Sequence, residues 1–132
     1  MTDLEKAKEI FNNDKFATET TGIEIIEVGN KSAKCFMKIT PKHLNAANRV
    51  MGGAIFTLAD FTYAVASNYN QTKNVTKTSE ISFLGQPAGD SLIAEAKVIK
   101  DGQTACTYEI MIKDEYNTPV ALVISNGIKL KD

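Results

Sequence analysis

The residues best placed to do chemistry in this sequence are a single aspartate, Asp60, and the apolar run around it. Residues 53–68 read GAIFTLADFTYAVASN, which is rich in helix formers, lacks proline and turns apolar side chains in most directions. We expect this helix to be buried nearly all round. A buried carboxylate without partners costs on the order of several kcal/mol. Asp60 is therefore either a reactive carboxylate in a cleft, with a pKa raised by burial, or one that faces a solvated gap or pairs with a Lys or Arg.

Two glycines, Gly52 and Gly53, stand at the start of this predicted helix, directly after Met51. Their backbone N–H groups would lie at the positive end of the helix dipole, where they can polarise a carbonyl oxygen. Glycine also allows a substrate to approach the backbone closely. A tight turn or close packing would require glycine equally, so the pair alone leaves both interpretations open.

Several other kinds of site are excluded or limited by residue counts. His43 is the only histidine, so a multi-histidine metal site is excluded and any Ser-His-Asp or Cys-His apparatus would need His43. Cys35 and Cys106 fit no metal or redox spacing, and both fall in alternating apolar patterns. We expect two buried free thiols rather than a disulfide, and no metal.

The composition is that of one globular domain spanning residues 1–132, with 43% hydrophobic and 23% charged residues. The 15 basic and 16 acidic side chains nearly cancel, which gives no basic field for a nucleic-acid partner. Acidic residues stand in Met1–Lys6 where a secretory signal would carry positive charge. No run approaches the roughly 20 apolar residues of a membrane span, so we expect a cytoplasmic protein with no membrane partner.

The pattern of apolar residues predicts the elements that must position Asp60. Thr2 and Glu5 form a capping box that would start an amphipathic helix. The predicted elements, in order, are a helix at 3–13, strands at 23–28 and 33–39, a loop at 42–52, the helix at 53–68, and strands at 75–84, 91–100, 104–113 and 120–130. An antiparallel sheet with one long helix on its concave face satisfies this α+β order. A doubly wound parallel sheet would need further helices after residue 70.

Residues 43–60 resemble the signature of hotdog-fold thioesterases of the phenylacetic-acid-degradation type. That signature runs Asn, five residues, His-Gly-Gly and then Leu-Ala-Asp, and it is matched here by Asn45, Gly52-Gly53 and 58–60. Val75-Thr76 leading into 81–84, and the turn at 89–92, resemble the strand and turn that follow in the family. The resemblance covers about residues 20–130 in element order, and it implies a hotdog fold with the sheet wrapped around one long central helix.

The resemblance also implies roles for four residues. Asp60 would be the catalytic carboxylate. It would act on water as a general base or attack directly as a nucleophile through a mixed anhydride. Gly52 would direct its backbone N–H to the thioester carbonyl. Asn45 would help to position substrate or water, and the hydroxyl of Thr76 would orient the water or the carboxylate.

Three positions depart from the family pattern. Met51 replaces the histidine before Gly-Gly, so a side-chain hydrogen bond is absent. Asn48 stands where glycine is usual, and Gly85-Gln86 stands where Arg-Pro is frequent. The last change should weaken contacts to the phosphates of coenzyme A.

Met51 is expected to alter rate or acyl preference rather than to abolish hydrolysis. A coenzyme A thiol has a pKa near ~8.5 and leaves readily without a strong general acid. Asp60 and the Gly52 amide could therefore suffice. His43, eight residues before Met51, either compensates for the missing histidine or is a surface loop residue.

Acyl specificity is expected from a pocket formed by Met51, Gly53, Phe56 and Tyr63 with residues of a partner chain. Simple core packing is the alternative for the two aromatic side chains. The acyl group itself, a small aromatic or a short to medium chain, is not determined by these residues.

The spacing of Gly52 and Asp60 predicts that one chain does not suffice. Eight residues of helix at ~1.5 Å each separate them by about 12 Å along the axis. A thioester carbon must lie roughly 3 Å from the attacking group while its oxygen meets the N–H. Two antiparallel copies can provide this, so we expect a homodimer with two shared sites, which the family commonly pairs into a homotetramer.

The expected function is hydrolysis of an acyl-CoA to free acid and coenzyme A, with coenzyme A entering as part of the substrate and no other cofactor. One alternative, motivated by Met51, is a non-catalytic protein that binds acyl-CoA or a small aromatic ligand. A more distant alternative is a hydratase on the same fold. Hydratases resemble a pattern in which histidine and aspartate act together, and no suitable histidine follows the helix here.

Overall fold

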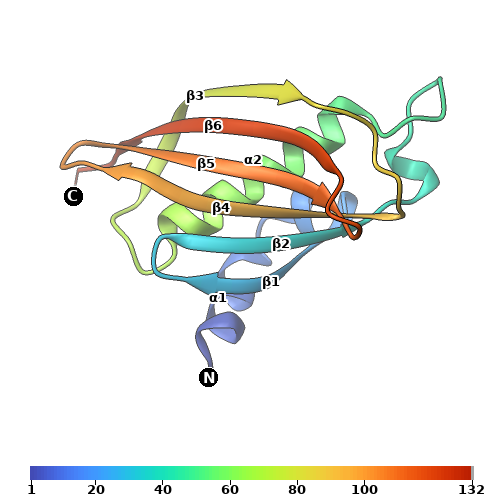
Figure 1. Cartoon of the computed structure of the whole chain (residues 1–132). Coiled ribbons are helices and arrows are strands. Elements are labelled where there is room, and N and C mark those ends of the chain that lie inside the picture. The colour runs from blue at the N-terminus through green and yellow to red at the C-terminus, as the bar shows by residue number, and fades with distance from the viewer. Residues whose placement is uncertain (132) are drawn as a thin grey trace.

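The computed structural model describes residues 1–131, and its elements follow the predicted order (Figure 1). The α-helices are α1 (Asp3–Phe11) and α2 (Gly52–Asn68), and the strands are β1 (Ile23–Gly29), β2 (Ser32–Lys38), β3 (Asn74–Phe83), β4 (Ser91–Asp101), β5 (Ala105–Asp114) and β6 (Pro119–Lys129). A short π-helix, η1 (Phe16–Thr20), and a 3-10 turn, η2 (Pro41–His43), were not predicted. Both are single turns without an apolar period that a sequence pattern could reveal.

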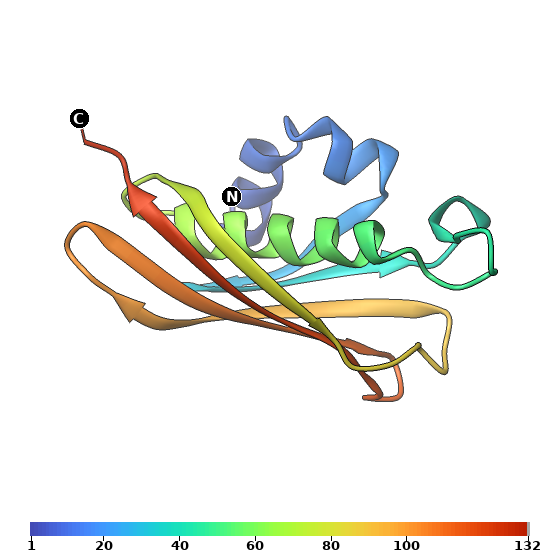
Figure 2. The ribbon, with the colours of Figure 1, turned by 90° about the horizontal axis from the view of Figure 1, so that it is seen from above.

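The strands form one six-stranded antiparallel sheet in the order β1-β2-β4-β5-β6-β3. The sheet curves, and α2 runs along its concave side (Figure 2). The predicted α+β architecture, one sheet wrapped around one long helix, is confirmed. No helix within residues 1–131 has both the length and the hydropathy needed to cross a bilayer.

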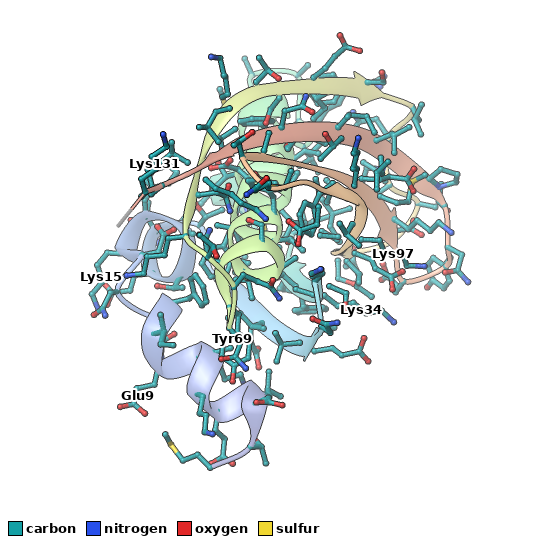
Figure 3. All side chains as sticks on the ribbon, turned by 90° about the vertical axis from the view of Figure 1, so that its left-hand side faces the viewer. Glu9, Lys15, Lys34, Tyr69, Lys97 and Lys131 are labelled. Carbon is teal, nitrogen blue, oxygen red and sulfur yellow. The ribbon has the colours of Figure 1, made fainter. Side chains whose placement is uncertain are left out.

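Alternation along the strands decides which face meets the helix. In β2 the buried residues are Ala33, Cys35 and Met37, while Lys34 points to the outer side of the sheet together with Lys97 of β4 (Figure 3). Cys35 and Cys106 are both buried and free, as predicted. Burial raises the pKa of the Cys35 thiol to about 12, so this thiol stays protonated.

The N-terminal segment, residues 1–22, lies on the same side of the sheet as α2 (Figure 2). The capping box of Thr2 and Glu5 starts α1 as predicted. Phe11 of α1 places its ring edge-on against Phe61 of α2, with ring centroids 6.3 Å apart. At the far end of α2, the Tyr69 hydroxyl donates to Asp3 Oδ1 over 2.8 Å, and Figure 3 shows Tyr69 beside this segment. The segment therefore covers a second part of α2.

The expectation that α2 is buried nearly all round is wrong. A stripe along the helix is only half-buried or exposed on the single chain. This uncovered stripe consists of Gly53, Phe56, Thr57, Asp60 and Ala64. Spacings of three and four residues place them on one side of the helix, which the sheet does not cover. Small and apolar residues dominate the stripe, which is why the sequence alone suggested burial there.

Candidate active site

Asp60 lies at the middle of the uncovered stripe. Its side chain makes no hydrogen bond or ion pair within residues 1–131, so the predicted alternative of a Lys or Arg partner does not apply there. The residue is exposed on a single chain rather than held in the interior. Partial burial against the surrounding apolar groups still raises the pKa of the Asp60 carboxyl, and the negative charge of nearby Asp14 raises it further.

Gly52 is the first residue of α2, and neither its N–H nor that of Gly53 has a hydrogen-bond partner in the described part of the chain. Free amides are expected in the first turn of a helix, where they attract negative charge. The ring of Phe83 packs directly on Gly52: a Cβ built there would lie 2.9 Å from Phe83 Cζ. The absence of a side chain at Gly52 thus admits the ring at the end of β3.

Met51 precedes the helix in an extended conformation, and its N–H donates to the carbonyl oxygen of His43 over 2.8 Å. The residue is 55% exposed. The terminal methyl lies 3.8 Å from the position that a Cβ on Gly53 would take. An apolar thioether therefore covers the start of α2, where the resembling family carries a hydrogen-bonding ring.

His43 is buried, with 7% of its surface exposed, so the expectation of a surface histidine is wrong. The backbone N–H of Thr40 donates to Nδ1 over 3.0 Å, and Nε2 lies 2.7 Å from the carbonyl oxygen of Thr21. Because an amide N–H can only donate and a carbonyl can only accept, the ring is the neutral Nε2–H tautomer. Both nitrogens are occupied, so His43 fastens the loop to the N-terminal segment and does not compensate for Met51.

Asn45 organises the loop that leads to α2. Its Oδ1 accepts from the N–H groups of Ala47 and Arg49, over 2.9 and 3.1 Å. Its own N–H donates to the Arg49 carbonyl over 2.8 Å. Asn48 has a φ of 60°, a left-handed conformation that glycine adopts freely and asparagine tolerates. The Asn-for-glycine departure at this position therefore keeps the same turn.

Thr76 lies on β3, the edge strand, opposite the buried Gly127 of β6. Paired residues share a face of the sheet, so the Thr76 side chain lies on the helix side. The register shifts between Thr76 and Thr78, and beyond this bulge Phe83 also faces the helix, paired with buried Ala121. Strand β3 thus presents Phe83 to the start of α2 and Thr76 farther along.

The two aromatic candidates for the acyl pocket have different surroundings. Phe56 is half-buried on the uncovered stripe. Tyr63 is in the core, 1% exposed, with its ring edge-on to Tyr108 at 5.5 Å. Its hydroxyl donates to Asn74 Oδ1 over 2.6 Å. Core packing, the alternative weighed for both, accounts fully for Tyr63. Phe56 packs against the core with part of its surface and keeps the rest uncovered.

An open groove of about 430 Å³ lies at the start of α2. Its walls come from the loop at 45–50, from Gly52 and Ile55 of α2, and from residues 83–86. Arg49, which sequence reasoning overlooked, lies on this groove and is the only arginine of the chain. Asp60 is not part of the lining. One chain therefore unites Asn45 and Gly52 but keeps the carboxylate farther along the helix.

Residues 47–121, more than half of the chain, match the thioesterase superfamily. The chain belongs to this superfamily. The Acyl-coenzyme A thioesterase PaaI of Escherichia coli K12 is 34% identical over 119 residues, which cover 89% of this chain and 84% of that protein. The structure of Escherichia coli PaaI superposes with a TM-score of 0.89 at 28% identity, covering 98% of this chain and 94% of that one.

A hypothetical thioesterase of Streptococcus pneumoniae TIGR4, solved with coenzyme A, shares the fold with a TM-score of 0.84. It is 19% identical, and the match covers 92% of this chain and 98% of that one. The predicted hotdog fold, the resemblance to PaaI-type thioesterases and the assignment as a thioester hydrolase are thereby confirmed for this thioesterase superfamily member. Within residues 1–131, no three His, Cys, Asp or Glu side chains gather as a metal site would require.

Proposed function

We propose that this thioesterase hydrolyses acyl-CoA, releasing a free acid and coenzyme A, with a small aromatic or a short to medium-chain acyl group. The observation that carries the proposal is the Asp60 carboxylate, which stands unpaired among residues 1–131 on an apolar helix stripe. A relative named for acyl-coenzyme A hydrolysis and a structural neighbour solved with coenzyme A support the substrate class.

The chemistry needs a negative group to attack, or to deprotonate an attacking water, and a positive site for the carbonyl oxygen. Asp60 supplies the first and the free Gly52 N–H, at the positive end of α2, supplies the second. The leaving thiolate of coenzyme A, with a thiol pKa near ~8.5, needs little protonation. Asp60 acts as a general base or as a nucleophile, and both routes use the same two groups.

The two groups must come from different chains. Gly52 and Asp60 are eight residues apart in α2, about 12 Å at ~1.5 Å per residue. Across a two-fold axis, the uncovered stripe of one chain would face that of its partner, with Gly52 of one opposite Asp60 of the other. We infer a homodimer with two shared sites, and dimers could pair again into a homotetramer.

Two uncovered features support such a dimer. The uncovered stripe of α2 carries the apolar and small residues that a helix normally buries. Strand β3 forms an edge of the sheet, and Val75, Phe83 and Leu84 on or just after it are each more than half exposed. An unpaired edge bearing apolar side chains is a ready surface for a second copy. One interface would cover both features.

The remaining candidates take supporting roles in this proposal. Asn45 keeps its Nδ2 group free while Oδ1 holds the loop, so Nδ2 can bind a water or the substrate. Thr76 orients the water or the carboxylate from β3. Met51, Gly53 and Phe56 line the acyl pocket, because all three lie around the start and the uncovered stripe of α2.

The competing function is ligand binding without turnover, motivated by the thioether of Met51 in place of a hydrogen-bonding ring. The test is to incubate the wild-type protein and the Asp60→Asn variant with a panel of acyl-CoA esters and to measure the thiol released. We expect wild-type turnover and a loss of at least about 100-fold in the variant. The matched control is Asp90→Asn, the same change at an exposed carboxylate on the turn before β4.

Hydrolysis at a near wild-type rate by Asp60→Asn would refute the assignment of Asp60. Thermal stabilisation of the wild-type protein by acyl-CoA, without thiol release from any ester, would favour the binding protein instead.

A further inference from the structure

Arg49 is unusual because the sequence has no other arginine and because of its position on the groove. It is the only arginine among the 15 basic residues, and it lies on the groove that begins at Gly52. No acidic residue lines this groove, and Arg49 forms no ion pair within residues 1–131. A guanidinium on the surface usually finds a carboxylate when one is in reach. This one is left free on a groove that Gly52 also lines.

The backbone that carries Arg49 is fixed. Its N–H donates to Asn45 Oδ1, and its carbonyl oxygen accepts from the Asn45 N–H, over 3.1 and 2.8 Å. Asn48 supplies the left-handed turn between them, with its N–H bonded to the Asn45 carbonyl over 3.0 Å. At the end of the loop, Leu44 pairs with Val50 as an isolated bridge. The backbone at Arg49 is therefore ordered before a ligand binds, and only the arginine side chain has to be ordered on binding.

The opposite wall of the groove carries no charge. Gly85 and Gln86 follow the end of β3 there, beside Phe83 and Leu84. The lining of the groove thus combines Gly52 and apolar side chains with one positive charge, on the loop wall. An acyl-CoA matches this combination of groups. Its thioester continues into a pantetheine arm and ends in a diphosphate and a 3′-phosphate.

We infer that Arg49 binds a phosphate group of the coenzyme A part of the substrate. The inference rests on the proposed function, because it takes acyl-CoA as the ligand. The planar guanidinium fork donates two parallel hydrogen bonds to phosphate oxygens, a geometry that a lysine ammonium does not offer. Gly85-Gln86 is expected to lose phosphate contacts, and Arg49 on the other wall of the groove offsets this loss.

The experiment measures binding of coenzyme A, 3′-dephospho-coenzyme A and pantetheine by calorimetry, for the wild-type protein, Arg49→Gln and Arg49→Lys. Lys42→Gln is the matched control, because Lys42 is exposed on the same loop but does not line the groove. We expect Arg49→Gln to weaken coenzyme A binding about tenfold or more and to leave pantetheine binding unchanged. Arg49→Lys should lose part of the affinity, and Lys42→Gln should bind as the wild type does.

The second readout is ionic strength. Wild-type affinity for coenzyme A should fall with added salt more steeply than that of Arg49→Gln, an effect that a merely structural role would not produce. If the Arg49 effect disappears with 3′-dephospho-coenzyme A, the 3′-phosphate is the partner. If it persists, the diphosphate is the partner, and both results support the inference.

Equal coenzyme A affinity in the wild type and Arg49→Gln would overturn the inference, as would equal weakening for pantetheine. Absence of coenzyme A binding to the wild-type protein would overturn it as well. The proposed function fails separately, if coenzyme A binds through Arg49 but no acyl-CoA is hydrolysed.

Discussion

The ring of Phe83, at the end of β3, lies against Gly52, the first residue of α2. This contact joins the edge strand of the sheet to the helix start that carries the proposed carbonyl-binding amide. A Cβ on Gly52 would come within 2.9 Å of Phe83 Cζ, closer than side chains tolerate. The position of the ring and the access to the amide therefore depend on one another.

Gly52→Ala tests this dependence. The alanine should force the exposed end of the Phe83 ring to move, while its higher helix propensity contributes up to about 1 kcal/mol of stability. We expect little net change in the free energy of unfolding but a fall of about tenfold or more in kcat/KM, because the new methyl group and the displaced ring both crowd the amide. Urea titration and steady-state kinetics measure the two effects separately.

Gly53→Ala is the matched control for the steric argument. A Cβ there meets only the Met51 terminal methyl, at an ordinary 3.8 Å, so the variant should gain helix stability without strain. A large loss of stability in Gly53→Ala, or unchanged kcat/KM in Gly52→Ala, would contradict the account.

Tyr63→Phe separates a core role from a role in the acyl pocket. The change leaves Asn74 Oδ1 without the hydroxyl that donates to it over 2.6 Å. It should lower the free energy of unfolding by about 1 kcal/mol. Because Tyr63 points into the core, the ranking of acyl-CoA substrates should stay the same. A changed ranking would show that Tyr63 contributes to the acyl pocket.

Asp114 predicts a specific pH dependence of stability. Its carboxylate is buried and accepts from the backbone N–H groups of Ala88, Gly89, Tyr116 and Thr118. Burial opposes the charge, but the four hydrogen bonds outweigh it and hold the pKa at about 2. This depressed pKa contributes stability that is present above the ordinary carboxyl pKa and is lost as pH falls toward about 2.

Asp114→Asn should therefore melt several degrees below the wild type at neutral pH, and the difference should shrink as the pH falls toward 2. Thermal melts at a series of pH values measure this. A difference that is constant with pH would show that the negative charge is not what matters.

The stability contribution of Asp60 is expected to change with pH in the opposite direction to that of Asp114. Its pKa is raised in the folded chain, so between the ordinary carboxyl pKa and the raised value the folded state holds more protons than the unfolded state. The contribution of this group to stability therefore falls as pH rises through that window. Asp60→Asn should be at least as stable as the wild type at neutral pH. The acid limb of wild-type kcat/KM should lie above the pH of an ordinary aspartate. A destabilised Asp60→Asn would contradict the first statement, and an acid limb at the pKa of an ordinary aspartate would contradict the second.

Local patterns were enough to predict the framework. The capping box at Thr2 and Glu5, the alternation in β2 and the uninterrupted apolar run of α2 each have a period or a spacing that only one element satisfies. Gly52 and Asp60 stood out as candidate site residues because a glycine pair and a carboxylate are both unusual in such a helix; their roles stay predictions.

The surroundings of individual side chains were not predictable, because distant segments supply them. His43 looks like a loop residue in the sequence, but Thr21 folds over it. Tyr63 and Phe56 are both aromatic residues of the same apolar helix, so the sequence does not distinguish them. Tyr63 is in the core because its side of the helix faces the sheet. Asp60 was expected in the interior because an apolar pattern does not show whether a helix is covered by its own chain or by a second copy.

The shared site is tested most directly by a hybrid dimer. Asp60→Asn lacks the carboxylate, and Gly52→Pro lacks the amide N–H. The backbone accepts proline at the first position of a helix, and Met51 already has the extended conformation that precedes proline. As in Gly52→Ala, the Phe83 ring has to move to make room for the new Cβ. Each variant alone should be inactive. Co-expressed with two different tags and purified through both, a hybrid holds one site with both defects and one intact site.

The account predicts that this hybrid regains about half of the wild-type rate per dimer. A hybrid no more active than the separate variants, or a failure to recover any hybrid, would show that Gly52 and Asp60 do not work across two chains.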